Sequence, residues 1–336
     1  MKDYSAYLGH PNQTYGVEEH RLVGGRGDGM RLLEVRNGQG LAFTVSADRC
    51  ADISRLTFNG KNVGFFSACG YVAPAFYDKE GIEFLKSFTA GFFTTCGLTA
   101  VGTPNVDDGE TLPLHGTIAN MPAGEIYSFE KDGKIHIKAT VRDASIFGRK
   151  LVLRREYIVD TARNVIKLHD EITNEGTKES PICLLYHCNM GYPMLSETSV
   201  VKIPHTEKTP RNARAAEGMN ESLIMEKPQP NFDEQCYYYN VKADAKGFGK
   251  AGIYNPDAKI GLIIKFDKST LDYFTEWKMM GEGEYVLGLE PGNCTPDGRN
   301  VLREKKILKF LAPGAVYKTN LEFSFTDRRS AFEAQF

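Results

Sequence analysis

The chain has 336 residues, of which 41% are hydrophobic and 25% are charged, as in an ordinary globular protein. Its formal net charge of -2 provides no basic field for a phosphate backbone, so we expect no nucleic-acid partner. No apolar run approaches the length that spans a bilayer, and the first residues lack the apolar core of a signal peptide.

Period-two alternation of apolar and polar residues recurs along the chain and predicts strands with one solvated face. It is clearest over residues 135–142, 166–173 and 317–325. Glycine-containing turns punctuate the strand patterns, at Asn37-Gly38, Asn59-Gly60, Asp132-Gly133 and Glu175-Gly176. Helical patterns are scarce, and the best short candidates are residues 77–87 and 328–335. The sequence therefore predicts an all-β chain, a large antiparallel β-sandwich forming a single domain over residues 1–336.

Residues 205–235 depart from this pattern because they are polar, irregular and rich in Pro and Asn. Connecting segments of this kind run over the surface and often carry functional residues. We expect this stretch to be a long excursion that borders a pocket.

The first candidate functional residue is His115, which follows an apolar stretch and precedes a glycine. Gly116 allows the backbone to turn closely around a ligand, so His115 is predicted to be presented in a loop. A loop histidine with a purely structural role fits the same pattern.

The second candidate is His187, at the end of the nearly continuous apolar run 182–186. It is expected where a central strand meets a turn that contains Gly191 and Pro193. A neutral imidazole becomes a proton donor near physiological pH at little cost. A histidine packed in a sheet is the alternative.

The third candidate is Glu290, which ends the apolar run 285–289 and is followed by a polar, turn-rich segment up to Arg299. Apolar neighbours would raise the pKa of its carboxyl toward that of a useful base. The alternative is a buried acid paired with Arg299 or with a backbone amide. One carboxylate and two histidines without metal-ligand spacing are suited to proton transfer, and no metal is expected.

Other catalytic patterns are absent from the sequence. It contains no G-x-S-x-G elbow, no Walker A loop and no H-E-x-x-H motif. A glycosidase needs two acids across one bond, and four acids close in sequence could supply such a pair: Glu276, Glu282, Glu284 and Glu290.

In their order and residues these motifs resemble the aldose 1-epimerase (galactose mutarotase-like) superfamily, in a divergent bacterial branch. The family's C-terminal pattern is matched most specifically, by Leu289-Glu290, Pro296-Asp297 and Pro313-Gly314 followed by Tyr317. Two histidine motifs and an opening hairpin complete the match over nearly the whole chain, at His187-Cys188-Asn189-Met190-Gly191, His115-Gly116, Asp48–Ile53 and Asn59–Val63.

The resemblance implies the β-sandwich of the galactose mutarotase type and an isomerase of the aldose 1-epimerase kind (EC 5.1.3.-). In such an enzyme Glu290 would be the catalytic base, His187 the general acid and His115 the residue that orients the substrate. Asn189, from the His187 motif, would contact the sugar. No cofactor is implied.

The sequence also departs from the family. The early Arg of a Gly-Arg-x-x-Asn-Arg segment is missing, and residues 84–87 occupy that region. Residues 233–235 match the family's Asp-His pair poorly. We therefore expect three other residues to line the sugar site and set its specificity: Trp277, Lys278 and Arg299. An indole face suits a pyranose C–H face, and a cation suits hydroxyls or an acidic substituent.

Two other functions remain open at this point. One is isomerisation of a modified or acidic sugar on the same scaffold, and the other is non-catalytic carbohydrate binding. The expected partner is a small-molecule sugar, with neither nucleic acid nor membrane, and a homodimer is an option. Seven scattered cysteines without C-x-x-C spacing favour reduced thiols and a cytoplasmic location.

Overall fold

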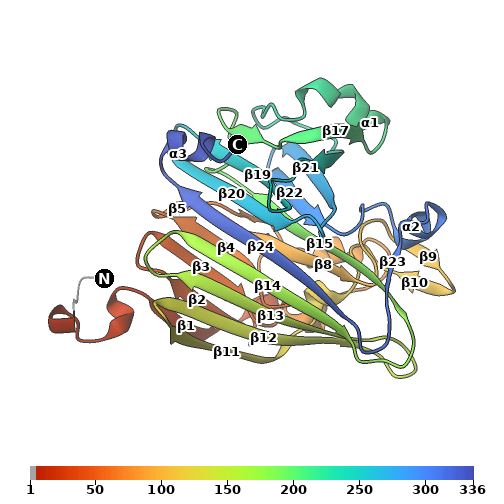
Figure 1. Ribbon diagram of the computed structural model, residues 1–336, viewed down its shortest axis with the longest axis horizontal. Coiled ribbons are helices and arrows are strands. Elements are labelled where there is room, and N and C mark those ends of the chain that lie inside the picture. Colours follow the sequence, from red (N-terminus) through yellow and green to blue (C-terminus); the bar gives the residue numbers. More distant parts are fainter. Residues whose placement is uncertain (1–4) are drawn as a thin grey trace.

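The computed structural model describes residues 5–336, and antiparallel strands form most of it (Figure 1). The largest sheet contains eight strands, in spatial order β11 (Ala123–Lys131), β12 (Lys134–Ala144), β13 (Lys150–Asp160), β14 (Val165–Asn174), β24 (Val316–Thr326), β20 (Ile260–Asp267), β19 (Phe248–Asn255) and β16 (Val200–Lys202). The three strands predicted most clearly from alternation lie in this sheet, as β12, β14 and β24.

Two further sheets complete the main architecture. The five-stranded sheet has the order β1 (Gly16–Arg21), β2 (Arg31–Arg36), β3 (Leu41–Ser46), β4 (Asp52–Phe58) and β5 (Lys61–Asn62). The seven-stranded sheet has the order β17 (His205–Pro210), β18 (Gln235–Val241), β21 (Tyr273–Gly281), β22 (Glu284–Gly292), β15 (Ser180–Met190) and β23 (Lys309–Leu311), with β8 (Phe93–Leu98) paired to β15. Two small ribbons are formed by β9 (Asn105–Asp107) with β10 (Glu110–Leu112), and by β6 (Phe65–Phe66) with β7 (Ala90–Gly91).

Helical segments are short in the described part of the chain. The α-helices are α1 (Ala213–Glu217), α2 (Arg299–Glu304) and α3 (Arg329–Glu333). The 3₁₀ turns are η1 (Ser5–Tyr7), η2 (Pro11–Gln13), η3 (Gly25–Gly27), η4 (Pro74–Phe76), η5 (Glu83–Lys86), η6 (Ile118–Asn120) and η7 (Met219–Glu221). The helix expected at the C-terminus is present as α3. The helix expected over residues 77–87 is wrong, because Gly81 adopts a φ of 50° and only η5 forms beyond it.

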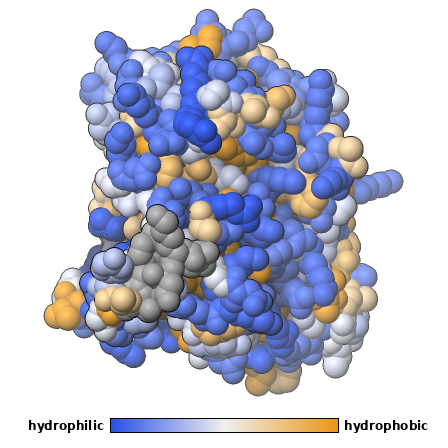
Figure 2. All heavy atoms as spheres, turned by 60° about the vertical axis from the view of Figure 1, so that its left-hand side comes forward, coloured by the Kyte–Doolittle hydropathy of each residue, from blue (hydrophilic) through white to orange (hydrophobic). Residues whose placement is uncertain are grey.

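The sheets pack face to face around an aromatic and aliphatic core. Successive side chains of a strand point to opposite faces, so alternate residues of β12, from Ile135 to Val141, are buried. Phe325 of the eight-stranded sheet meets Phe58 of the five-stranded sheet, with ring centroids 5.9 Å apart. On the face of the molecule in Figure 2, apolar side chains occur in small scattered groups between hydrophilic ones.

A buried ionic network joins the layers inside this core. Arg155 of β13 bonds Asp52 of β4 at 2.5 Å and Asp170 of β14 at 2.7 Å. The Tyr186 hydroxyl of β15 donates to Asp170 at 2.7 Å. Tyr186 therefore points into the sandwich, and its neighbour His187 must point to the opposite face of β15. The outer face of the seven-stranded sheet thus receives the candidate functional residues.

Candidate active site

Neighbouring strands β15 and β22 bring His187 and Glu290 together. Their register pairs Cys188 with Leu289 and Leu185 with Gly292, which places His187 across from Glu290. His187 Nδ1 lies 3.2 Å from Glu290 Oε1, and both side chains are buried. β15 continues three residues past His187, and β22 continues two residues past Glu290. The two residues therefore lie within strands, whereas the sequence predicted them at strand ends.

Asn189 fixes the orientation and tautomer of His187. Its Nδ2 donates to the His187 carbonyl at 2.8 Å, and its Oδ1 lies 2.6 Å from His187 Nδ1. Because the amide nitrogen is committed to a carbonyl, Oδ1 is the acceptor and His187 Nδ1 carries the hydrogen. The neutral ring then has its lone pair on Nε2. Asn189 is fully buried and does not line the cavity, so the expectation of a direct sugar contact is corrected to a positioning role.

His115 reaches the same place from the loop between β10 and η6, as the sequence predicts. Its backbone has a φ of 58°, and its amide donates to the Gly102 carbonyl at 3.0 Å. Gly116 is required for the tight approach, because a Cβ there would lie 2.2 Å from the Gly97 carbonyl oxygen. The ring centroids of His115 and His187 are 5.5 Å apart. His115 Nδ1 is buried and finds no hydrogen-bond partner within residues 5–336.

The three residues open onto a cavity of about 340 Å³. Its polar side chains are Thr103, His115, His187, Arg211, Glu234, Cys236, Thr275 and Glu290. Its apolar side chains are Ile82, Phe84, Leu85, Phe88, Pro104, Leu114, Trp277 and Pro296. The volume and the mixed lining suit one small organic molecule with several polar groups.

Aromatic rings enclose the two histidines. Phe88 lies against His187 at a centroid distance of 5.4 Å, and Trp277 contacts it from another strand at 5.1 Å. Phe84 lies 5.6 Å from His115. These rings exclude water from the imidazoles, which strengthens electrostatic interactions inside the cavity.

Burial sets the protonation of the site. It raises the pKa of Glu290 well above its usual value, the charge of Glu234 adds to this, and Arg211 partly offsets it. Burial lowers the pKa of His187 to about 4 against the opposing hydrogen bond to Asn189. The pKa of His115 is lowered well below its usual value by burial, then by His187 and Arg211. Burial therefore favours the protonated carboxyl of Glu290 and the neutral form of both imidazoles.

Trp277 borders this pair from β21, as the sequence predicts. Its Nε1 donates to Glu234 Oε2 at 2.7 Å. The strand partner of Trp277 is Gly288, and a Cβ at that position would lie 2.2 Å from Glu290 Oε1 and 2.9 Å from Trp277 Cβ. The glycine therefore makes room for the carboxyl group and the indole side by side.

Sequence reasoning did not single out Arg211, which follows β17 and reaches the cavity. Its Nη2 donates to Thr103 Oγ1 at 2.8 Å and to the Pro296 carbonyl at 3.3 Å. It is the one cationic side chain among the described residues that line this cavity. Arg211 and Glu234 both belong to the stretch 205–235, which was expected to border a pocket, but no local motif distinguishes the arginine.

Lys278 does not reach the cavity, which corrects its expected role. Adjacent residues of a strand face opposite sides, so Lys278 points away from the side that Trp277 occupies. Its Nζ donates to the carbonyls of Ile224 at 2.7 Å and Glu221 at 3.3 Å. Lys278 thereby anchors the excursion that delivers Arg211.

Arg299 is also placed elsewhere. It begins α2, where its Nε lies 2.6 Å from Asp107 Oδ2 and its Nη1 lies 3.0 Å from Glu110 Oε2. This buried ion cluster fastens the β9–β10 ribbon to α2, and Arg299 faces a different surface hollow. The expected sugar contact is corrected to a structural ion pair, and the alternative of a Glu290–Arg299 pair does not occur.

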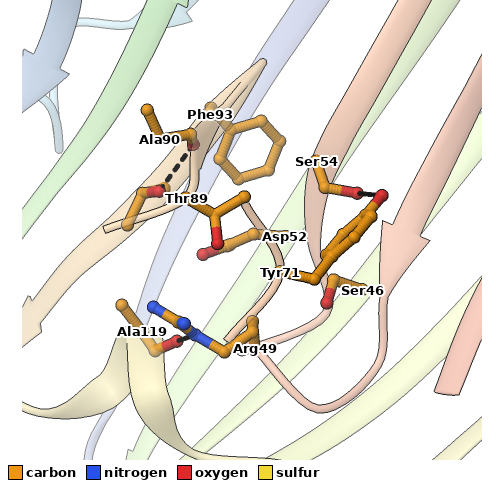
Figure 3. A pocket seen from close by; sticks show the side chains of 10 residues that line it. Ser46, Arg49, Asp52, Ser54, Tyr71, Thr89, Ala90, Phe93 and Ala119 are labelled. Atoms are coloured by element: carbon orange, nitrogen blue, oxygen red, sulfur yellow. Dashed lines mark hydrogen bonds between the residues drawn. The ribbon is translucent and has the colours of Figure 1, made fainter. Parts of the chain in front are cut away.

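Arg49 stabilises two backbone segments that adjoin the cavity. Its guanidinium donates to the carbonyls of Ala119, Val72 and Ser87 at 2.8–2.9 Å. These bonds hold the segment that precedes Phe88 and the turn η6 that follows His115. Arg49 is one of the residues that line a small hollow (Figure 3). The volume of this hollow is about 20 Å³, which has room for one water molecule and not for a sugar.

Neither a cluster of metal ligands nor a membrane-spanning helix is found among residues 5–336. Within 5–336, no group of three or more His, Cys, Asp or Glu side chains could hold a metal ion. None of the helices in that range combines the length and the apolar character needed to cross a bilayer.

Comparisons with known proteins agree with this fold. A candidate aldose 1-epimerase from Klebsiella pneumoniae subsp. pneumoniae MGH 78578 superposes with a TM-score of 0.90 at 27% identity, over 95% of this chain and 85% of that one. A galactose mutarotase-like protein from Clostridium acetobutylicum gives 0.67 at 13% identity, over 94% and 100% of the two chains. Galactose 1-epimerase from Lactobacillus acidophilus NCFM gives 0.62 at 15% identity, over 93% and 98%. No curated protein matches the sequence.

The fold and its neighbours define the class, a β-sandwich of the aldose 1-epimerase and galactose mutarotase-like superfamily. A family model described as a domain of unknown function, DUF4432, matches residues 27–325. The chain belongs to the DUF4432 family.

Proposed function

We propose that this protein is an aldose 1-epimerase that interconverts the α and β anomers of a sugar by general acid–base catalysis. The observation that carries the proposal is the 3.2 Å approach of His187 Nδ1 to Glu290 Oε1 in a cavity that His115 and Trp277 also line. The superfamily resemblance supports the same activity. A small-molecule sugar as partner and a cytoplasmic location belong to this proposal.

The reaction needs one proton to leave the anomeric hydroxyl and one to reach the ring oxygen. Glu290 as carboxylate takes the first proton, and His187 as imidazolium supplies the second. The C1–O5 bond then opens, the aldehyde rotates, and the ring closes on the other face with the two roles exchanged. His115 hydrogen-bonds the sugar and holds the developing charge. A positioned acid and a positioned base each increase the reaction rate by about 10²–10⁴-fold.

The proton inventory of the empty site fits this cycle. Burial favours the proton on Glu290, and the lone pair of the neutral His187 ring is on Nε2, because Nδ1 carries the hydrogen bonded to Asn189. Transfer of the Glu290 proton to His187 Nε2, through the hydroxyl groups of the bound sugar, gives the carboxylate and imidazolium that the first step requires. No proton has to enter from bulk water during turnover.

The four acids close in sequence do not supply a carboxylate pair, because only Glu290 among them lines the cavity. Glu276 faces the opposite side of β21 from Trp277, and Glu284 is exposed at the start of β22. An acidic-sugar isomerase keeps one supporting observation, the presence of Arg211 in the cavity. The carboxylate of Glu234 lies in the same cavity and offsets that charge, so we favour a neutral sugar.

Anomer exchange measured by polarimetry and by NMR over a panel of aldoses tests the proposal. We expect at least one aldose to equilibrate faster with enzyme than with buffer alone, in proportion to enzyme concentration. Fluorescence of the single tryptophan, Trp277, reports sugar binding and distinguishes a non-catalytic binding protein from an enzyme. Sugar binding without accelerated exchange would show a carbohydrate-binding protein instead.

A further inference from the structure

We propose that the sugar is a 6-deoxyhexose, whose methyl group packs on an apolar wall of the cavity formed by Ile82, Phe84, Leu85 and Phe88. The inference rests on the proposed function, because it names the substrate class of that site. It is carried by the lining of the cavity and by the exposure of its rim.

The wall is continuous and lies against the catalytic histidines. Phe84 and Phe88 are in ring contact, with centroids 5.1 Å apart. Phe88 lies against His187 and Phe84 against His115, at 5.4 and 5.6 Å. A sugar ring that meets both imidazoles therefore has one of its edges against this wall.

The wall offers no hydrogen-bonding side chain. The charged residues of its segment, Glu83 and Lys86, pair with each other and do not line the cavity. The polar groups Arg211, Glu234 and Glu290 come from other segments. A hydroxymethyl group held against the inner part of the wall, at Phe84 and Phe88, would lose its water partners without replacement, whereas a methyl group loses none.

The outer part of the wall leaves apolar side chains exposed to solvent, and a bound ligand would cover them. Leu85 is 52% exposed and Ile82 is 60% exposed, although both are large apolar residues at the mouth of the cavity. A methyl group placed there would remove apolar surface from water on both sides of the contact. These two positions can also be changed without disturbing the core.

The test compares sugars that differ only at C6. We would measure kcat/KM for anomer exchange with D-galactose and D-fucose, D-glucose and 6-deoxy-D-glucose, and L-mannose and L-rhamnose. Burial of one methyl group contributes about fourfold, and a site that leaves an added hydroxyl unpaired discriminates by up to about 100-fold. We expect the 6-deoxy sugar to be preferred by about 10-fold to 100-fold in the pair of the accepted configuration.

Two variants locate the effect on the wall. The double substitution Ile82→Ser with Leu85→Ser should bring the preference toward one. Phe76→Ser is the matched control, because Phe76 is 53% exposed on the neighbouring turn η4 and does not line the cavity. It should leave the preference unchanged.

Each result decides for or against the inference. Equal or opposite preference in every pair that exchanges overturns it. If no sugar exchanges but Trp277 fluorescence shows tighter binding of a 6-deoxy sugar, the proposed function fails and the ligand class stands. If no sugar exchanges or binds, both fail. If the double variant turns a dimer into a monomer without changing the preference, the rim is a contact between copies and the inference is overturned.

Discussion

The tautomer of His187 depends on Asn189, a residue that does not line the cavity. Asn189 accepts the Nδ1 hydrogen of His187 and is itself fixed by the His187 carbonyl. Nε2 is therefore the ring nitrogen left for exchange with the sugar. The motif His-x-Asn places both residues on one face of β15, and that spacing explains why the asparagine follows the histidine by two.

Asn189→Ala should disturb the histidine more than the fold. Without the acceptor, both neutral tautomers of His187 become populated and anomer exchange falls by about 10-fold to 100-fold. The ¹⁵N spectrum of His187 should show one neutral tautomer in the wild type and a mixture in the variant. A single unchanged tautomer together with wild-type exchange would remove Asn189 from the mechanism.

The pairing of β21 with β22 creates the space that the Glu290 side chain occupies. Gly288 lies beside Trp277 across the β21–β22 pairing and two residues before Glu290, so its missing side chain leaves the space that the carboxyl group fills. The position of the Glu290 carboxyl group is thus a property of two paired strands.

Gly288→Ala should therefore displace Glu290 or Trp277. We expect loss of most anomer exchange with a stability decrease of about 1–3 kcal/mol, the usual cost of overpacking. Gly124→Ala is the control, because a Cβ at Gly124 meets only one atom, at 4.0 Å. Full exchange in Gly288→Ala would show that the site tolerates a shifted carboxyl group.

Arg299 belongs to the ion cluster that joins α2 to the β9–β10 ribbon. Substitution of Arg299 tests whether this cluster stabilises the fold. Arg299→Ala leaves the buried carboxylate of Asp107 with only Arg303, so we expect a stability loss of about 3 kcal/mol by urea unfolding. Sugar preference should stay as in the wild type, because Arg299 does not line the cavity. Arg21→Ala, at an exposed position on β1, is the control and should change neither the stability nor the sugar preference. A changed sugar preference without destabilisation would restore Arg299 to the sugar site.

Across the whole molecule, two buried ionisable groups make stability depend on pH in opposite directions. The pKa of His187 is lowered to about 4, so the unfolded chain binds the proton more readily and stability falls as pH drops from about 6.5 toward 4. The pKa of Glu276 is raised to about 8, so the folded state keeps its proton and the corresponding stability is lost as pH rises through 8. Burial is the main cause in both cases.

Glu276→Gln should remove the loss of stability that occurs as the pH rises from about 4.5 to about 8. Each unit of pKa difference corresponds to about 1.4 kcal/mol, so the wild type should lose a few kcal/mol between pH 5 and pH 9 that the variant retains. Urea unfolding at several pH values measures the difference. Parallel stability curves for the two proteins would contradict the raised pKa of Glu276.

Much of the sandwich follows from local sequence pattern, and the remainder depends on long-range pairing. Alternation predicts β12, β14 and β24 because one face of each is buried. The same rule applied to Trp277-Lys278 would have separated their faces, so the error on Lys278 was avoidable. Arg211 was not predictable in this way, because it reaches the cavity through contacts with Thr103 and Pro296 that are distant in sequence.

The central claim is that Glu290 and His187 together move the anomeric proton. Exchange spectroscopy by NMR on Glu290→Gln tests it most directly, with the sugar that the wild type accepts. The amide keeps the shape but cannot take a proton, so exchange should fall by about 10²–10⁴-fold while folding is retained. Glu284→Gln, at the exposed start of the same strand, should exchange as the wild type does. A folded Glu290→Gln protein with wild-type exchange would contradict the account.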